Sequence, residues 1–216
     1  MHAETVRAFA DAPVVPAANR SEIVERPTIA VIGARELGCR IALFAVHAGC
    51  RVILEDVSPE VLDRAVAWVT RLPDDAVRRD PSFKKLEMIS TLLRTARSAE
   101  EACREADIII ETVADEEELK LELYTIFDRF AKPGAILAST ATTVSIDDLA
   151  DMTFCADRCV GMRFCAGAAA PRRMELIRGR ATSNETVARC REFARLLGME
   201  VGIVESLTVP PASGTS

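Results

Sequence analysis

Two kinds of hydrophobic pattern alternate along the chain. Short runs of β-branched and aliphatic residues, such as TIAVIG, RVILE and ADIIIETV, are typical of strands that are buried on both faces. Longer segments place apolar residues at every third or fourth position, which is typical of amphipathic helices. The runs predict strands at 28–33, 51–55, 92–95, 106–113, 135–140, 159–165, 173–178 and 200–204. The periodic segments predict helices at 36–48, 58–72, 99–105, 116–130, 145–151 and 184–197.

The order of these elements predicts the fold class. Strands and helices alternate almost throughout, which is typical of an α/β protein with a doubly wound, mostly parallel sheet and helices on both faces. The last strands have short connections, so we expect them to run antiparallel. Residues 26–206 are expected to form this domain, after an N-terminal extension at 1–25 and before a flexible tail at 207–216. Trp68 lies within a predicted helix and is expected in the core.

The turn after the first predicted strand has the spacing of a dinucleotide-binding loop, with one substitution. It reads Gly33-Ala34-Arg35-Glu36-Leu37-Gly38, so the first and third glycines of G-x-G-x-x-G are present and Arg35 replaces the second. The first glycine makes the tight turn, and the third lets the helix pack against the strand. The second lets the backbone approach a pyrophosphate. We therefore expect a Rossmann-like fold, with all six loop residues as cofactor-binding candidates.

An acid at the end of the second strand supports this interpretation. Asp56 follows RVILE, at the position where a carboxylate binds the ribose hydroxyls of NAD and disfavours NADP; Glu55 is the alternative. We expect NAD as the cofactor, with weakened binding, because the Arg35 side chain occupies space that the pyrophosphate needs. Two other interpretations stay open: Arg35 contacts a phosphate, or it is a solvated residue beside a site without a ligand.

Composition and charge narrow the class of protein. The 216 residues carry a net charge of −6, which disfavours nucleic acid as a partner. No run reaches the roughly 18 apolar residues of a membrane span, and the N-terminus has no basic segment followed by an apolar block. We expect a cytoplasmic protein without membrane contact. The seven cysteines form no C-x-x-C pair and are expected to be buried apolar residues, so no metal site is predicted.

From about residue 28 to residue 206 the sequence resembles the NAD-binding domain of 3-hydroxyacyl-CoA dehydrogenases. The matching pieces, in the family's order and spacing, are IAVIGA, ALFAVHAGCRVILEDVSPE, ADIIIETVADEEELKLELY, AILASTATTVSI, DRCVGMRF and ATSNETVARCREFARLLG. The resemblance implies an enzyme that uses NAD to oxidise the 3-hydroxyl group of an acyl-CoA. It also implies a histidine base that takes the hydroxyl proton and a glutamate that orients this histidine.

The chain departs from the family's pattern at the base. The histidine position is Arg163, whose guanidinium stays protonated and cannot act as a general base. The orienting glutamate matches Glu175, which we expect to form an ion pair with Arg163. The serine that binds the substrate oxygen matches Thr142, and the acid after the fourth strand matches Asp115. The resemblance therefore gives Thr142, Arg163 and Glu175 as catalytic candidates and adds Asp115 to the cofactor-binding candidates.

The resemblance also implies an all-helical domain that follows this one, makes the dimer and closes over the acyl chain. The sequence stops before such a domain, which we expect to be lacking. Three interpretations stay open: an impaired or inactive relative that binds a nucleotide or acyl-CoA, an active oxidoreductase with altered residues or a partner chain, and a structural module with an empty cofactor site. In each, we expect a homo-oligomer or a partner chain to cover the face that the helical domain covers in the family.

Overall fold

The computed structural model describes residues 26–70, 89, 91–165 and 173–205, so the expected extension at 1–25 and tail at 207–216 lie outside the described residues. The described strands are β1 (Thr28–Ile32), β2 (Arg51–Glu55), β3 (Leu93–Ala96), β4 (Ile108–Glu111), β5 (Ile136–Ser139), β6 (Cys159–Cys165), β7 (Arg173–Arg178) and β8 (Glu200–Glu205). The described helices are α2 (Glu36–His47), α3 (Pro59–Thr70), α6 (Ala99–Cys103), α7 (Glu117–Phe130), α8 (Ile146–Ala150), α9 (Asn184–Leu196) and the 3-10 helix η2 (Ala156–Arg158).

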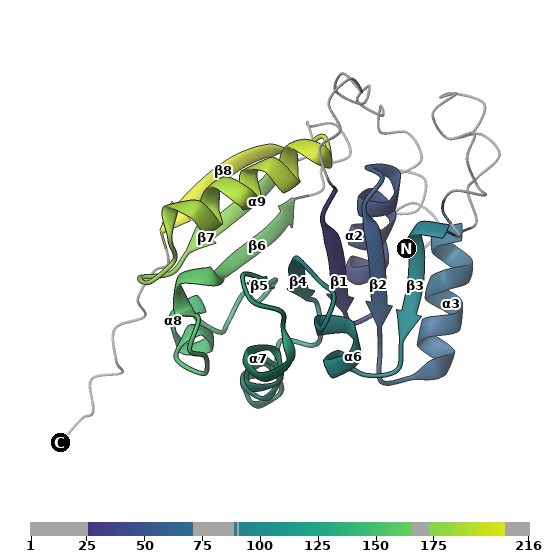
Figure 1. The fold of residues 1–216 in the computed structure, drawn as a ribbon, viewed down its shortest axis with the longest axis horizontal. Coiled ribbons are helices and arrows are strands. Elements are labelled where there is room, and N and C mark those ends of the chain that lie inside the picture. The colour runs from purple at the N-terminus through teal and green to yellow at the C-terminus, as the bar shows by residue number, and fades with distance from the viewer. Residues whose placement is uncertain (1–25, 71–88, 90, 166–172, 206–216) are drawn as a thin grey trace.

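All eight of these strands join in one twisted sheet (Figure 1). Their order is β3-β2-β1-β4-β5-β6-β7-β8. Neighbours from β3 to β6 run parallel, whereas β7 runs antiparallel to β6 and β8 runs parallel to β7. Only residues 166–172 separate β6 from β7, which is too short for the crossover that a parallel pair needs. The predicted fold class is confirmed, including the reversed direction of the last strands.

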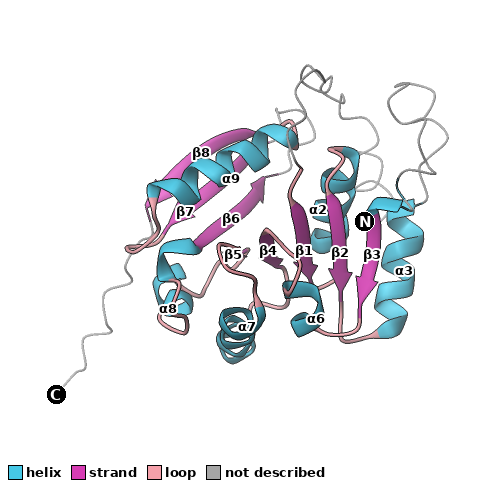
Figure 2. Cartoon of the chain, in the orientation of Figure 1, coloured by secondary structure: helices cyan, strands magenta, loops and turns pink. Residues whose placement is uncertain are grey.

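Helices cover both faces of the sheet (Figure 2). Side chains of α2, α3 and α9 pack on one face, and side chains of α6, α7 and α8 pack on the other. The split follows from the alternation of side chains along each strand. In β1, Ile29 and Val31 belong to the first core, and Ala30 and Ile32 belong to the second. Because both faces are covered, this strand is buried at every position and apolar from Ile29 to Ile32.

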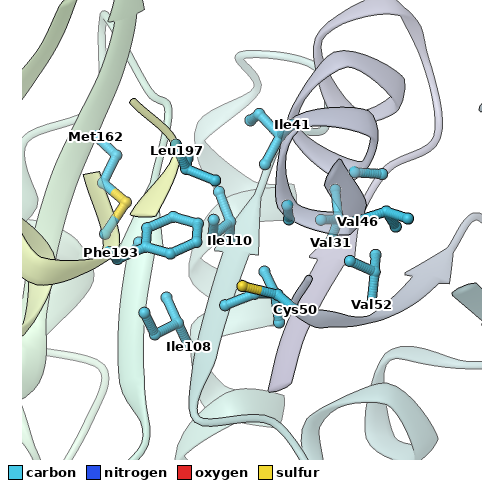
Figure 3. Packing of buried hydrophobic residues seen from close by; sticks show 14 of the residues in the cluster. Val31, Ile41, Val46, Cys50, Val52, Ile108, Ile110, Met162, Phe193 and Leu197 are labelled. Atoms are coloured by element: carbon cyan, nitrogen blue, oxygen red, sulfur yellow. The ribbon is translucent and has the colours of Figure 1, made fainter. Parts of the chain in front are cut away.

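The core under α2 and α9 connects the two ends of the sheet. In Figure 3, Phe193 and Leu197 from the C-terminal part of the chain lie beside Ile110 of β4, with Met162 of β6 near the phenyl ring. Ile41 of α2 belongs to the same cluster, and all five side chains are at most 5% exposed. Burial of a side chain of this size contributes roughly 1.5–3 kcal/mol. The antiparallel end of the sheet is therefore part of the same domain as the parallel part.

The strand order reverses between β1 and β4. The chain builds β2 and β3 on one side of β1, and β4, β5 and β6 on the other. In open α/β sheets, ligands bind at the carboxyl ends of the strands at such a point. The loops that follow β1, β2, β4 and β5 lie at this edge, and they hold Gly33, Asp56, Asp115 and Thr142.

The expectation for Trp68 is wrong. Its side chain is 42% exposed on α3. The buried positions of this helix are Ala65 and Val69, which are four residues apart and so lie on one face. Trp68 lies roughly 100° around the helix from Val69, so it points away from the core.

The contact between α2 and β1 gives a first prediction: Gly38→Ala lowers the free energy of unfolding by about 3 kcal/mol or more. A Cβ at position 38 would lie 1.9 Å from the carbonyl oxygen of Gly33 and 2.8 Å from Thr112 Oγ1. The matched control is Gly134→Ala, where φ is +81° but no atom lies within 4 Å of the new Cβ, so about 1 kcal/mol is expected. Urea unfolding measures both variants, and equal losses would contradict a special constraint at Gly38.

Candidate functional site

The loop between β1 and α2 is held from both neighbouring strands. From β2, the Glu55 carbonyl accepts the Gly33 N–H at 2.9 Å, and Asp56 Oδ2 accepts the Ala34 N–H at 2.9 Å. From the end of β4, the Thr112 hydroxyl donates to the Gly33 carbonyl at 2.8 Å. Gly33 has a φ of 101°, a region that favours glycine. These contacts fix the course of the loop without any contribution from position 35.

Arg35 follows the tight turn in a conformation that needs no glycine. Its φ is −78° and its ψ is −169°, which is extended backbone. Its carbonyl accepts the Cys39 N–H at 2.9 Å, which begins α2, and its side chain is exposed. Glu36 is the first residue of the helix, so the loop ends in one positive and one negative side chain. Arg35 therefore adds an exposed positive charge beside the loop, with a backbone conformation that any residue adopts.

Asp56, which follows β2, is the acid that contacts the β1–α2 loop and faces solvent. Its Oδ2 accepts the Ala34 N–H, and its Oδ1 accepts the Ser58 N–H at 3.0 Å. The side chain is partly exposed, and each oxygen keeps a lone pair for a further donor. The alternative acid, Glu55, is 4% exposed. Burial raises the pKa of Glu55 to about 7, and the charges of Asp56 and Glu100 act in the same direction.

Asp115 connects the loop after β4 to the loop after β5. Its Oδ2 accepts three hydrogen bonds, from the Thr142 hydroxyl at 2.6 Å and from the N–H groups of Thr142 and Thr143 at 3.1 Å each. Burial opposes ionisation of this carboxyl, but the hydrogen bonds and the charge of Lys120 outweigh it and lower its pKa. The structure thus brings together two of the predicted site residues, Asp115 and Thr142, at the carboxyl edge of the sheet.

A buried ion pair lies beside these residues. Lys120 Nζ of α7 is 2.8 Å from each carboxylate oxygen of Glu111, and the two side chains are 1% and 0% exposed. The Ser139 hydroxyl and the Val113 N–H each donate to the Glu111 carboxylate at 2.7 Å. Lys120 Nζ also lies 3.7 Å from Asp115 Oδ1. The network therefore joins the ends of β4 and β5 to the first turns of α7.

The sequence interpretation missed Glu111, Lys120 and Ser139. A signal for the pair exists, because Glu111 ends the apolar run of β4, and Lys120 shares the buried face of α7 with Tyr124 and Phe127. A lysine at a core-facing position needs a buried acid as its partner. The sequence pattern does not identify which of the neighbouring acids is that partner.

The catalytic candidates on β6 and β7 form the expected ion pair. Arg163 and Glu175 lie directly opposite each other in the antiparallel register, with 3.3 Å between Arg163 Nη1 and Glu175 Oε2. Arg173 Nη2 lies 3.8 Å from the other oxygen of Glu175. The Arg163 side chain is 46% exposed and that of Glu175 is 22% exposed. The carboxylate therefore lies between two guanidinium groups on an accessible part of the sheet.

The predicted site residues form separate groups. Among the described residues, no hydrogen bond or ion pair joins Thr142 and Asp115 to Arg163 and Glu175. Within the same part of the chain, no group of three or more His, Cys, Asp or Glu side chains is arranged to hold a metal ion. None of the described helices has the length and apolar character needed to cross a membrane.

Comparison with known proteins gives one consistent match. The family described as "3-hydroxyacyl-CoA dehydrogenase, NAD binding domain" matches residues 28–206. A probable 3-hydroxybutyryl-CoA dehydrogenase of Bacillus subtilis is 31% identical over 176 residues, which cover 81% of this chain and 61% of that protein. The 3-hydroxybutyryl-CoA dehydrogenase of Bradyrhizobium diazoefficiens is 31% identical over 182 residues, which cover 82% and 60%. The chain thus spans about three fifths of the length of these relatives.

Solved structures agree with this match. The (S)-3-hydroxybutyryl-CoA dehydrogenase of Ralstonia eutropha superposes with a TM-score of 0.76 at 26% identity, over 84% of this chain and 64% of that one. The 3-hydroxybutyryl-CoA dehydrogenase of Escherichia coli K12 superposes with a TM-score of 0.77 at 26% identity, over 85% and 39%.

The buried ion pair gives a second prediction: Lys120→Met lowers the free energy of unfolding by about 3–5 kcal/mol. The variant leaves the Glu111 carboxylate buried without its cation. The double variant Glu111→Gln/Lys120→Met should regain part of the loss, because it buries no charge. As a control, Lys132→Met breaks a half-exposed pair with Asp107 and should cost less than about 1 kcal/mol. Urea unfolding near pH 7 measures all three, and equal losses in the two single lysine variants would contradict the prediction.

A third prediction concerns pH and Glu55. Its pKa in the folded state is about 7, above the ordinary value of 4.5, so the folded protein holds a proton that the unfolded chain releases. Stability therefore falls as the pH rises from about 4.5 to about 7 and stays lower above that. Glu55→Gln should remove this fall, which is on the order of 2–3 kcal/mol. Unfolding curves at about pH 5 and pH 8 measure it, and the exposed control Glu118→Gln should keep the wild-type slope. An unchanged slope in Glu55→Gln would show that another group causes the fall.

Proposed function

Since this chain belongs to the family of 3-hydroxyacyl-CoA dehydrogenase NAD-binding domains, we propose that it binds NAD at the β1–α2 loop and is impaired in hydride transfer to or from an acyl-CoA. The observation that carries the second half is the ion pair between Arg163 and Glu175. The chain spans only about three fifths of its curated relatives, so their whole activity enters here as part of the proposal.

NAD binding is supported by the shape and charge of the β1–α2 loop. The first turn of α2 has N–H groups without intrahelical acceptors, which suit a pyrophosphate. Asp56 is held in place by two backbone N–H groups and has lone pairs for the two ribose hydroxyls. Arg35 is exposed, so its side chain can turn away from the loop or contact a phosphate oxygen. Bound NAD supplies a hydride acceptor at its nicotinamide ring.

Impaired turnover is supported by the charge at the base position. A general base must accept a proton, and the Arg163 guanidinium has no free lone pair to accept one. Its partner Glu175 is engaged with Arg163 and also lies close to Arg173. This carboxylate therefore stabilises two cations instead of orienting a neutral imidazole. Substrate binding by an acyl-CoA is compatible with such a site, because these arginines favour an anionic ligand.

Residual turnover is a second candidate, favoured by the contact between Thr142 and Asp115. The Thr142 hydroxyl donates to Asp115 at 2.6 Å, so its oxygen keeps lone pairs that can accept a hydrogen bond from a substrate hydroxyl. This contact positions a substrate, but it supplies no group that titrates near neutral pH.

A cytoplasmic location and self-association complete the proposal. The cytoplasmic location is supported by the seven cysteines, which are all free thiols.

Calorimetric titration with NADH tests the binding half. The wild-type protein is expected to bind, Asp56→Ala to bind about tenfold more weakly, and Arg35→Gly to bind more tightly because the second glycine returns. The control Asp151→Ala removes an exposed acid at the end of α8 and should bind like the wild type. Absence of heat in a folded wild-type sample would overturn the proposal in favour of an empty cofactor site.

Oxidation of NADH with acetoacetyl-CoA tests the catalytic half. The wild-type protein is expected to show no turnover above the blank. Arg163→His places an imidazole opposite Glu175 and should produce measurable turnover. A general base typically raises the rate by a factor of about 10²–10⁴. Arg163→Gln removes the same charge without supplying a base and should stay inactive. Wild-type turnover at the rate of a dehydrogenase would show that the altered residues support the reaction.

A further inference from the structure

Two cysteines lie one turn apart between α8 and β6. Cys155 directly precedes the 3-10 helix η2, and Cys159 follows it as the first residue of β6. The Arg158 N–H donates to the Cys155 carbonyl at 2.8 Å and closes this turn. Cys155 is 6% exposed and Cys159 is 0% exposed. The C-x-x-x-C spacing therefore brings two buried side chains into the same part of the interior.

The two cysteines share a neighbouring hydroxyl, that of Thr153. Thr153 Oγ1 lies 3.7 Å from Cys159 Sγ, and the Cys155 N–H donates to the same oxygen at 3.3 Å. Cys159 Sγ also lies 3.7 Å from the Cys155 carbonyl oxygen. The Tyr124 hydroxyl is buried without a hydrogen-bond partner among the described residues, and Tyr124 belongs to the same core cluster as both cysteines. These contacts make a local polar cluster within an apolar core.

The surroundings favour the thiolate form of Cys155. The hydrogen bond from Cys159 is the main cause that lowers the pKa of Cys155 to about 7, and burial opposes it. The charge of Arg158 and a hydrogen bond from Thr153 lower this pKa further, whereas Asp128 of α7 raises it. The same contact and burial raise the pKa of Cys159. One thiol of the pair is therefore suited to attack, and the other keeps its proton.

The other buried cysteines lack these features. Burial raises the pKa of Cys39 and Cys50 to about 11, and that of Cys103 and Cys190 to about 12. A thiol that stays protonated in an apolar site is a poor nucleophile. Oxidation of the folded protein should therefore select between these two classes of cysteine.

From the closed turn that separates the two residues, the Thr153 hydroxyl that both contact and the approach of Cys159 Sγ to the Cys155 carbonyl, we infer that Cys155 and Cys159 are a dithiol that hydrogen peroxide converts to an intrachain disulfide. The Cys155 thiolate attacks one peroxide oxygen, the S–O bond forms, the O–O bond breaks, and hydroxide leaves, so that Cys155 becomes a sulfenic acid. The Cys159 sulfur then attacks Cys155 Sγ, the S–S bond forms, the S–O bond breaks, and water leaves with the thiol proton. Two thiols are oxidised and one peroxide is reduced to two waters.

The segment that carries the pair lies at the surface. Met152 is 41% exposed and Phe154 is fully exposed, next to Cys155. The Phe154 N–H donates to Asp128 Oδ1 at 2.8 Å, which ties this segment to α7 by a partly exposed contact. Cys155 therefore directly follows an exposed segment, whereas Cys103 and Cys190 lie within the helices α6 and α9 and are 0% exposed.

Peroxide treatment of the folded full chain, followed by unfolding, alkylation and mass spectrometry, tests the inference. Trypsin cleaves after Arg158, so the two cysteines fall in different peptides. A disulfide is expected to appear as these two peptides linked, lighter by two hydrogens than their sum. The rate of linkage should rise about tenfold between about pH 6 and pH 8, as the Cys155 thiolate forms. Cys103 and Cys190 should stay alkylated and react at least about tenfold more slowly.

Three variants separate the steps. Cys155→Ser should give no linked peptides and leave Cys159 reduced. Cys159→Ser should leave a sulfenic acid at Cys155 that dimedone traps, and Cys103→Ser should form the link as the wild type does. A folded wild-type sample that gives no linked peptides, or one in which Cys155 is oxidised no faster than Cys103, would overturn the inference. A link from Cys155 to any other cysteine would overturn it as well.

Discussion

The buried contact between Lys120 and Glu111 is the interaction on which the edge of this sheet depends. A lysine with 1% exposure can stay charged only if an acid meets it, and Glu111 does so with both oxygens at 2.8 Å. Ser139 and Val113 satisfy the same carboxylate, so the ends of β4 and β5 and the start of α7 have one common centre. The geometry that Asp115 and Thr142 share follows from this centre, because Lys120 also faces Asp115.

The fold could be predicted from the sequence because each layer leaves a regular trace in it. Strands covered on both faces carry continuous apolar runs, and the last strands were expected to reverse because their connections are short. The ion pair of Arg163 and Glu175 was expected from the family resemblance, and the β6–β7 register places the two residues opposite each other. The buried ion pair of Lys120 and Glu111 could not be predicted, because it forms where α7 packs beside the end of β4. No local sequence pattern shows which acid lies next to Lys120. Trp68 was misplaced because a large aromatic side chain says less about burial than the spacing of its neighbours does.

The two arginines at candidate site positions lie in different structural settings. Arg35 lies where the backbone is already extended, and the turn before it is fixed by Gly33, Asp56 and Thr112. Arg163 lies on β6 opposite Glu175 of β7, with a side chain that is 46% exposed. Both side chains are exposed, and the fold around them matches the solved dehydrogenase structures at TM-scores of 0.76 and 0.77. Structural similarity of this kind therefore reports on packing and gives little information about the chemistry of the site.

The two hydrogen bonds that Asp56 accepts have a consequence for the thermodynamics of ligand binding. With Oδ2 on the Ala34 N–H and Oδ1 on the Ser58 N–H, the carboxylate has one orientation before any ligand arrives. The site is preorganised, so a ribose that docks there would not have to order this side chain or the two loops that it joins. A ligand at this position would lose little conformational entropy of the protein, and differences in affinity between variants of the loop would arise mainly from direct contacts. A substitution of one exposed loop residue can then change the affinity of this site, while the carboxylate and the two loops that it joins keep their conformation.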